Sequence, residues 1–232
     1  IKREAVMSGV KLTVSLCVGF IVIVVSMFVV SVLRPEQLTD EEMRARGVFV
    51  LPQPRDIAPF NLTDQNGQSF TRDNLEGAWS FVFFGFTQCP DVCPTSMSIL
   101  GQVELALRDA SGEFDPDFRG ILVSVDPDRD DQATLKRYVE AFSPRFTGLR
   151  ADRDQLAPFA RQLNVAFAKV PLSTESAAPT NSPAVVEADR YTIDHTGNIV
   201  IINPRGHYHG FIKLPHDVET IKLSYQTLAA SF

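Results

Sequence analysis

Two cysteines separated by three residues are the part of this chain best suited to chemistry. Cys89 and Cys93 lie in the segment Phe-Gly-Phe-Thr-Gln-Cys-Pro-Asp-Val-Cys-Pro, residues 84–94. Thiols at this spacing could close a disulfide, exchange with another disulfide, or hold one soft metal ion as thiolates. The spacing alone leaves these alternatives open.

The two thiols are predicted to lie at the turn between a buried strand and a helix. The apolar run at 80–84 has the composition of a buried strand, and apolar residues recur at helical spacing from Pro94 onward. Pro94 suits the first turn of a helix and disfavours helical backbone at the residue before it, which places Cys93 at the N-cap. The positive end of the helix dipole is then expected to lower the pKa of the Cys93 thiol.

Alternating strand and helix patterns predict an α/β domain with a central mixed sheet covered by helices on both faces. A hairpin is expected at 60–70, because residues alternate around Asn66-Gly67. The apolar run at 120–126 suits a buried parallel strand, and Asp130 or Asp131 is placed to cap the helix after it.

The C-terminal half continues the alternation with one long interruption. Residues 172–190 are rich in Ser, Thr, Ala and Pro without a period, which predicts a flexible loop. Loops of this length in compact domains tend to have functional roles. The other predicted elements are a helix starting near Asp154, an edge strand at 165–170, a hairpin formed by 191–194 and 198–203, and a last helix carrying Val218, Ile221, Tyr225 and Leu228.

This order of elements is that of the thioredoxin architecture, and three segments resemble the SCO/SenC family more specifically. They are residues 84–94, the acidic Val-Asp-Pro-Asp-Arg-Asp at 125–130, and Tyr-Thr-Ile-Asp-His-Thr at 191–196. The resemblance covers roughly residues 55–230 and extends to an N-terminal anchor. Members of this family are membrane-anchored copper proteins that assist the assembly of cytochrome c oxidase.

The resemblance implies that Cys89, Cys93 and His195 bind one copper ion, Cu(I) or Cu(II). It further implies a metallochaperone that delivers the ion to the dinuclear CuA centre in the copper-receiving subunit of the oxidase. The chemistry agrees, because thiolates favour Cu(I) and imidazole suits both oxidation states. Since a Cys89–Cys93 disulfide would abolish binding, a periplasmic thiol reductant and a copper donor are expected as further partners.

Other functions fit the same thiols. The pair could be redox-active, in a thiol–disulfide oxidoreductase that reduces the cysteines of the oxidase copper site, or in a thiol peroxidase. Three spacer residues instead of two, and the absence of a task for His195, weaken these alternatives. A structural disulfide and a redox or copper sensor are further hypotheses.

The remaining polar clusters have simpler interpretations. The aspartates at 126, 128, 130 and 131 are expected to form a solvated turn and helix cap, because the run lacks the Gly and terminal Glu of a calcium loop. His207 and His209 alternate along a strand-like segment and are expected to be exposed hairpin residues, with weak accessory copper binding as the alternative.

An uncharged stretch of 22 residues, 12–33, is long enough to cross a hydrocarbon core of about 30 Å as a helix. A cleavable signal peptide is the alternative, but its apolar region normally spans about 7–15 residues. The predicted organisation is therefore a cytoplasmic N-terminus at 1–11, a transmembrane anchor at 12–33, a linker at 34–56, and a thioredoxin-like copper-binding domain at 57–232.

The charge distribution bears on location and partners. Of the formal net charge of −6, residues 1–33 carry +2, which leaves −8 for the rest of the chain. Nucleic acid is not expected as a partner, because its backbone would repel an acidic body. Lys2, Arg3 and Lys11 before the span favour a single-pass protein of the inner (cytoplasmic) membrane with its domain in the periplasm, or in the mitochondrial intermembrane space of a eukaryote.

Overall fold

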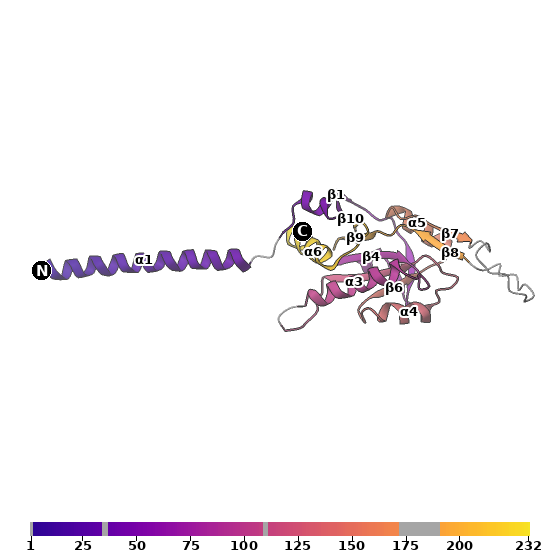
Figure 1. The fold of residues 1–232 in the computed structure, drawn as a ribbon, viewed down its shortest axis with the longest axis horizontal. Helices are drawn as coiled ribbons and strands as arrows, with labels where there is room; N and C mark the ends of the chain where they lie inside the picture. Colours follow the sequence, from indigo (N-terminus) through magenta and orange to yellow (C-terminus); the bar gives the residue numbers. More distant parts are fainter. Residues whose placement is uncertain (1, 34–36, 109–110, 172–190) are drawn as a thin grey trace, which may run out of the picture. The chain divides into compact units, whose positions relative to one another are not determined.

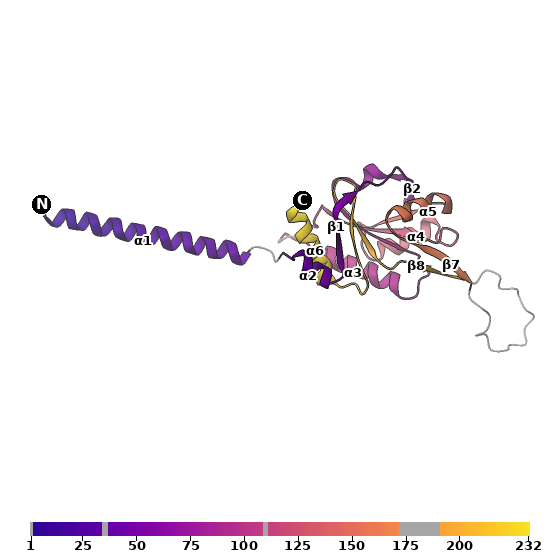
Figure 2. The ribbon, with the colours of Figure 1, turned by 90° about the horizontal axis from the view of Figure 1, so that it is seen from above.

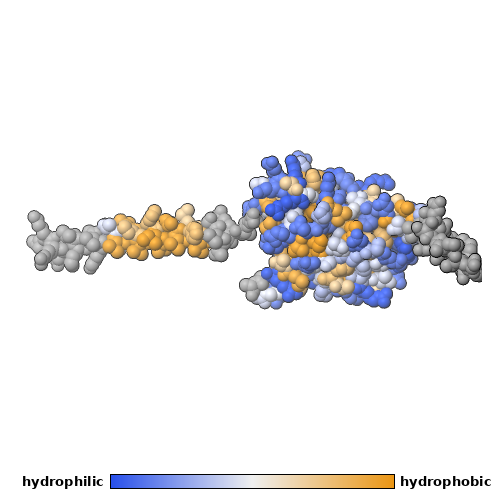
Figure 3. Space-filling model, in the orientation of Figure 1, coloured by the Kyte–Doolittle hydropathy of each residue, from blue (hydrophilic) through white to orange (hydrophobic). Residues whose placement is uncertain are grey.

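The chain divides into two units, Ile1–Gln37 and Leu38–Phe232. The computed structural model describes residues 2–33, 37–108, 111–171 and 191–232. In the first unit, helix α1 (Lys2–Leu33) contains the stretch Leu12–Val29, which is long and apolar enough to cross a membrane. Figure 3 shows this stretch as an uninterrupted apolar band. The helix has the length and composition that the anchor hypothesis requires.

The second unit is built on one mixed sheet of eight strands (Figure 1). Its central strands β4, β5 and β6 are parallel, and the strands outside them pair antiparallel. In spatial order the strands are β1 (Val48–Arg55), β10 (Tyr208–Ile212), β9 (Ile199–Ile202), β4 (Trp79–Gly85), β5 (Phe118–Ser124), β6 (Thr147–Arg150), β2 (Asn61–Asp64) and β3 (Ser69–Thr71). The predicted central mixed sheet is confirmed.

Helices cover both faces of this sheet, as the thioredoxin-like fold class requires. On one face α3 and α6 lie side by side, and Tyr225 of α6 packs against Phe81 of β4. On the other face Phe159 of α5 packs against Phe84 of β4. Residues 81 and 84 are three apart in the strand, so their side chains point to opposite faces of the sheet. The helices are α2 (Asp40–Ala45), α3 (Val92–Ala106), α4 (Gln132–Glu140), α5 (Arg153–Gln162), α6 (Val218–Ser231) and the short 3-10 helix η1 (Arg72–Leu75).

The predicted linker at 34–56 is wrong over most of its length, because residues 38–55 belong to the fold. Thr39 and Glu42 cap α2 reciprocally, side chain to backbone. Strand β1 then pairs with β10, and the Val48 side chain has no exposed surface. The prolines at 52 and 54 suggested a tether, yet an edge strand tolerates proline where its N–H groups face away from the ladder. The folded domain therefore begins at Leu38 instead of residue 57.

A substitution at Val48 separates a folded strand from a tether. We expect Val48→Ala to lower the free energy of unfolding by about 2 kcal/mol, because it removes two buried methyl groups. The matched control is Gln53→Ala on the exposed part of the same strand, which should change it by less than about 0.5 kcal/mol. Urea unfolding measures both, and equal, negligible effects would restore the linker hypothesis.

Several other sequence predictions are confirmed. The hairpin at 60–70 is formed by β2 and β3, and β5 is a buried strand parallel to β4. Asp131 caps α4, since its carboxylate accepts the Thr134 N–H at 2.7 Å. Helix α5 begins at Arg153, within one residue of the prediction, and α6 carries the expected apolar face.

The predicted hairpin around Thr196-Gly197 is wrong. Strand β8 (Tyr191–His195) pairs with β7 (Phe167–Pro171) in a separate two-stranded ribbon, so the predicted edge strand at 165–170 does not extend the central sheet (Figures 1 and 2). Strand β9 is buried at all four positions and lies between β4 and β10. A strand buried on both faces needs two neighbours within a sheet, which leaves none for β8. The loop predicted at 172–190 lies outside the described residues.

Candidate metal centre

Cys93 lies inside the first turn of α3, at the carboxyl end of β4. The helix begins at Val92 with Asp91 as its N-cap, and the Asp91 carbonyl accepts the Thr95 N–H at 3.2 Å. The prediction of Cys93 as the N-cap is therefore wrong by two residues. A proline disfavours helical backbone at the residue before it but does not forbid it, and here both Cys93 and Pro94 lie within the helix.

The predicted low pKa of Cys93 is also contradicted. Its side chain has no exposed surface, and burial, followed by the nearby Cys89 sulfur, raises the pKa of the Cys93 thiol. Gly85 at the end of β4 makes this position possible, because a Cβ there would lie 2.9 Å from Cys93 Sγ. The metal-free site therefore holds Cys93 as a neutral thiol, which a bound metal would have to deprotonate.

Cys89 occupies the loop between β4 and α3 and is partly exposed. The Cys93 backbone N–H points at its sulfur, with a nitrogen to sulfur distance of 3.4 Å. Both cysteines are free thiols. One sulfur of the pair is thus open to solvent and partners while the other is enclosed.

His195 ends β8 and points toward the thiols from the ribbon. Its Nε2 lies 3.6 Å from Cys93 Sγ, and its Nδ1 lies 3.2 Å from the Thr196 carbonyl oxygen, to which it can donate. Phe83 and Phe86 present their rings edge-on to the imidazole, at centroid distances of 5.8 and 6.0 Å. Burial lowers the pKa of His195, so the ring is neutral at pH 7 with a lone pair on Nε2 directed at the thiols.

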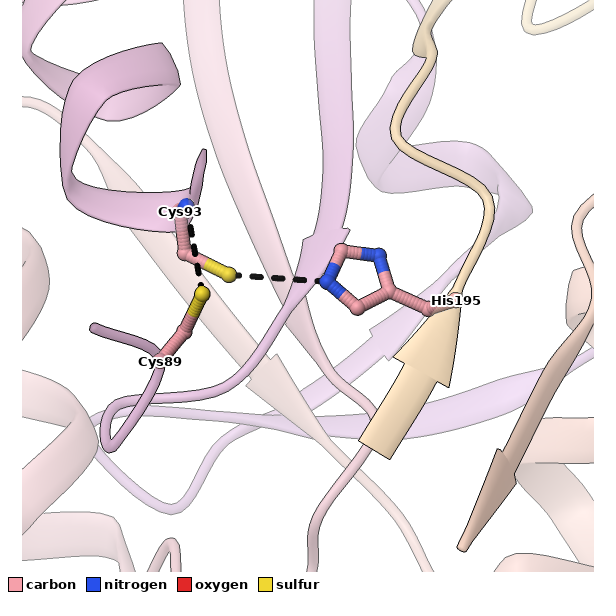
Figure 4. A group of neighbouring side chains, drawn as sticks. All are labelled: Cys89, Cys93 and His195. Atoms are coloured by element: carbon pink, nitrogen blue, oxygen red, sulfur yellow. Dashed lines mark hydrogen bonds between the residues drawn. The ribbon is translucent and has the colours of Figure 1, made fainter. Parts of the chain in front are cut away.

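Three ligand atoms thus converge at one point, as the resemblance implied. The donor atoms of Cys89, Cys93 and His195 all lie within 4.8 Å of one another (Figure 4). A single ion of the soft or borderline class could contact all three after small rotations of the side chains. A pocket of about 290 Å³ opens beside them, lined among others by Pro90, Val92 and Leu214. The three side chains could therefore hold one metal ion together, beside an open pocket.

The acidic run after β5 is a brace for this centre, and its predicted solvated state is wrong at two positions. Asp126 and Asp130 have no exposed surface. Asp130 accepts hydrogen bonds from the Thr87 hydroxyl at 2.6 Å, the Thr87 N–H at 3.1 Å and the Ser124 hydroxyl at 2.6 Å. Thr87 begins the thiol loop, so the loop is tied to the end of β5. Burial raises the pKa of Asp130, and these three donors oppose that shift.

Removing this carboxylate should measurably destabilise the domain. We expect Asp130→Ala to lower the free energy of unfolding by about 2 kcal/mol, because three hydrogen-bond donors lose their acceptor, and the Ser124 hydroxyl among them is buried. The matched control is Asp128→Ala, whose exposed ion pair with Lys169 should contribute under about 1 kcal/mol. Urea unfolding of both variants tests the difference, and equal losses would mean that Asp130 has no bracing role.

The two other histidines considered from sequence do not join the centre. His207 Nε2 lies 3.0 Å from an Asp56 carboxylate oxygen, while His209 packs edge-on against Trp79 and accepts from the Asn203 amide at 3.2 Å. His207 lies in the β9–β10 turn and His209 in β10, and both are half-buried, more enclosed than predicted. Neither belongs to the group of possible metal ligands found among the described residues.

Sequence reasoning missed the supporting residues Gly85, Asp126, Asp130 and Tyr191. One signal for the aspartates was available: they follow β5 directly, and the carboxyl ends of neighbouring parallel strands meet at one edge of a sheet. That edge also carries Cys89 and Cys93. No comparable signal marked Gly85, because its role depends on how closely α3 approaches β4.

The fold and the site together define a thioredoxin-like protein in which two thiols and one imidazole lie close enough to hold one metal ion. The model of the SCO1/SenC family matches residues 51–230, and the chain belongs to this family. The family expected from the sequence motifs is therefore confirmed.

Named relatives agree with this membership. A putative copper-binding protein of Stutzerimonas stutzeri is 32% identical over 172 residues, which cover 72% of this chain and 74% of the relative. The mitochondrial protein SCO2 homolog of mouse is 33% identical over 174 residues, 75% of this chain but 62% of that protein. The crystal structure of Arabidopsis thaliana ScoI with copper bound is 26% identical, with a TM-score of 0.64, and the match covers 76% of this chain and all of that one.

Proposed function

We propose that this protein is a copper metallochaperone that binds one copper ion through Cys89, Cys93 and His195 and delivers it to the CuA centre of cytochrome c oxidase. The observation that carries the proposal is the convergence of the three donor atoms within 4.8 Å at the end of β4. Copper as the cargo is supported by the copper-binding relative and by the copper-bound ScoI structure.

The site geometry supports transfer as well as binding. Three protein ligands leave a coordination position open, which an incoming ligand of a recipient can occupy before the first ligands leave. Cys89 is partly exposed and lies at the rim of the pocket, so it is the ligand that a partner reaches first. Cys93 is fully buried and would keep hold of the ion while exchange begins.

The anchor and the compartment follow from the same proposal. Helix α1 would hold the protein in the inner membrane by its segment at 12–33, with residues 1–11 in the cytoplasm and the domain in the periplasm, or in the mitochondrial intermembrane space in a eukaryote. A periplasmic reductant would keep the thiols reduced, and a copper donor would load them. If a protease added outside the membrane left residues 38–232 intact, the domain would lie on the cytoplasmic side and this orientation would be reversed.

Copper titration and transfer test the function. The reduced chain in detergent micelles should bind one Cu(I), and the chain with an oxidised Cys89–Cys93 pair should bind none. Mixing the loaded chain with the reduced, copper-free soluble domain of the oxidase subunit should move copper to that domain. Retention of all copper by the chain, or no stoichiometric binding, would refute the proposal.

The unequal burial of the thiols favours one second function, a reductase of the oxidase copper site. The partly exposed Cys89 would attack a disulfide of the partner to form a mixed disulfide, which Cys93 would then resolve. The partner gains two electrons and two protons as two thiols, and Cys89–Cys93 becomes a disulfide. This reaction does not need His195, which separates it from copper delivery.

A further inference from the structure

The loop between β5 and α4, residues 125–131, contacts both halves of the metal centre. On the thiol side, Asp130 holds Thr87 of the cysteine loop. On the imidazole side, the buried Asp126 carboxylate accepts the Tyr191 hydroxyl at 2.7 Å. The cysteine loop follows a strand of the main sheet, whereas the β7–β8 ribbon is a separate sheet. The 125–131 loop therefore supports both of them.

Tyr191 is contacted at its hydroxyl group, its ring and its backbone carbonyl. The Arg129 guanidinium lies 3.9 Å from the centre of its ring and donates to its carbonyl oxygen at 3.2 Å. Arg129 is itself paired with Asp126. Lys169 of β7 approaches the same ring at 4.4 Å and pairs with Asp128 of the 125–131 loop. Strand β8 is therefore fastened to the domain at its first residue.

The fastening reaches His195 through the geometry of the strand. Tyr191, Ile193 and His195 occupy alternate positions of β8 and so share one face, and Ile193 between them is buried. His195 lies about 13 Å along the strand from Tyr191, at about 3.3 Å per residue. Because β8 has no partner in the central sheet among the described strands, its position depends on such side-chain contacts and on the short connection to β9.

We propose that Tyr191, held by Asp126 and Arg129, is a positioning residue that fixes where β8 presents His195 to the thiols and thereby sets the affinity for Cu(II). The inference rests on the proposed copper-binding function. Cu(I) is satisfied by two thiolates, whereas Cu(II) prefers planar arrangements with nitrogen or oxygen ligands. An imprecise imidazole therefore weakens Cu(II) binding more than Cu(I) binding.

The test is Tyr191→Phe, which removes only the hydroxyl group. In the metal-free chain, amide hydrogen exchange of β8 should become at least about tenfold faster, because a hydrogen bond to a buried carboxylate is lost. Cu(II) affinity should fall about tenfold, the fold-change that corresponds to losing one hydrogen bond to a charged group. The thiolate-to-Cu(II) absorption band should shift, while Cu(I) affinity changes less.

The matched control is Tyr225→Phe, which also removes a tyrosine hydroxyl that donates to an aspartate, here Asp115 at 2.8 Å. Tyr225 packs on Phe81 and Phe118, away from the carboxyl ends of β4 and β5 that carry the centre. This variant should keep the copper affinities and the spectrum.

The proposal is overturned if Tyr191→Phe keeps the wild-type Cu(II) affinity and spectrum, or if Tyr225→Phe loses as much. If the wild-type chain itself binds no copper, the proposed function fails. Hydrogen exchange in the metal-free chain then still decides whether Tyr191 holds β8.

Discussion

His195→Ala should lower Cu(II) affinity by more than roughly 100-fold, because loss of a direct ligand exceeds the cost of losing an outer partner. Nε2 of His195 is the nitrogen donor of the group and lies 3.6 Å from Cys93 Sγ. Cu(I) affinity should fall less, since both thiolates remain. The rate at which Cys89 exchanges with a small disulfide should stay near the wild-type value, because the imidazole has no part in that reaction. Competition titrations with copper chelators measure the affinities.

His207→Ala is the matched control for this experiment. It removes an imidazole that is also half-buried but contacts Asp56 at the β9–β10 turn. Copper binding should stay unchanged in this variant. If His195→Ala holds Cu(I) and Cu(II) as tightly as the wild type does, His195 is not a ligand, and the reductase hypothesis becomes the better one.

Gly85→Ala should weaken copper binding by crowding Cys93. The added Cβ would lie 2.9 Å from Cys93 Sγ and 3.0 Å from the Phe83 ring, in a region without exposed surface. Relief requires the Cys93 sulfur or the Phe83 ring to shift, and both lie beside His195, so affinity for both copper states should fall by about 10–100-fold. The free energy of unfolding should fall by about 1–3 kcal/mol through overpacking.

Gly120→Ala separates these two effects. Its Cβ would overlap the buried Phe146 ring, near the start of β5 and away from the thiols. The free energy of unfolding should fall by about 1–3 kcal/mol or more, yet the folded protein should bind copper as tightly as the wild type. Chemical unfolding combined with copper titration gives both quantities. Unchanged copper affinity in Gly85→Ala would show that the position of Cys93 tolerates displacement.

The strands of the core were predictable because their patterns have a local physical cause. Consecutive apolar residues at 80–84 and 120–126 can be buried on both faces only as central strands, and the structure has them so. The ligand set came from the three family motifs, since Cys93 and His195 are 102 residues apart and no local pattern joins them. Spacing alone could not have found the imidazole.

The errors have a common origin in tertiary contacts. Proline composition suggested a tether, but this segment is strand β1, which pairs with β10. A turn signal suggested a hairpin of residues 191–194 with 198–203, but β8 pairs with β7 instead. The helix dipole argued for a low pKa at Cys93, but complete burial of the sulfur outweighs it. Burial and strand partners depend on segments distant in sequence, so single-segment reasoning does not reach them.

The division of the ligands between two sheets has a consequence for the order in which the site comes apart. A hydrogen bond joins the thiol loop to the loop after β5, and α3 packs on β4 and β5, whereas the ribbon carrying His195 forms a sheet of its own. A two-stranded ribbon opens at lower free energy than a central sheet. Swinging the ribbon outward would leave a bound ion on the two sulfurs alone with the rest of the domain intact, so release of the ion would not require global unfolding.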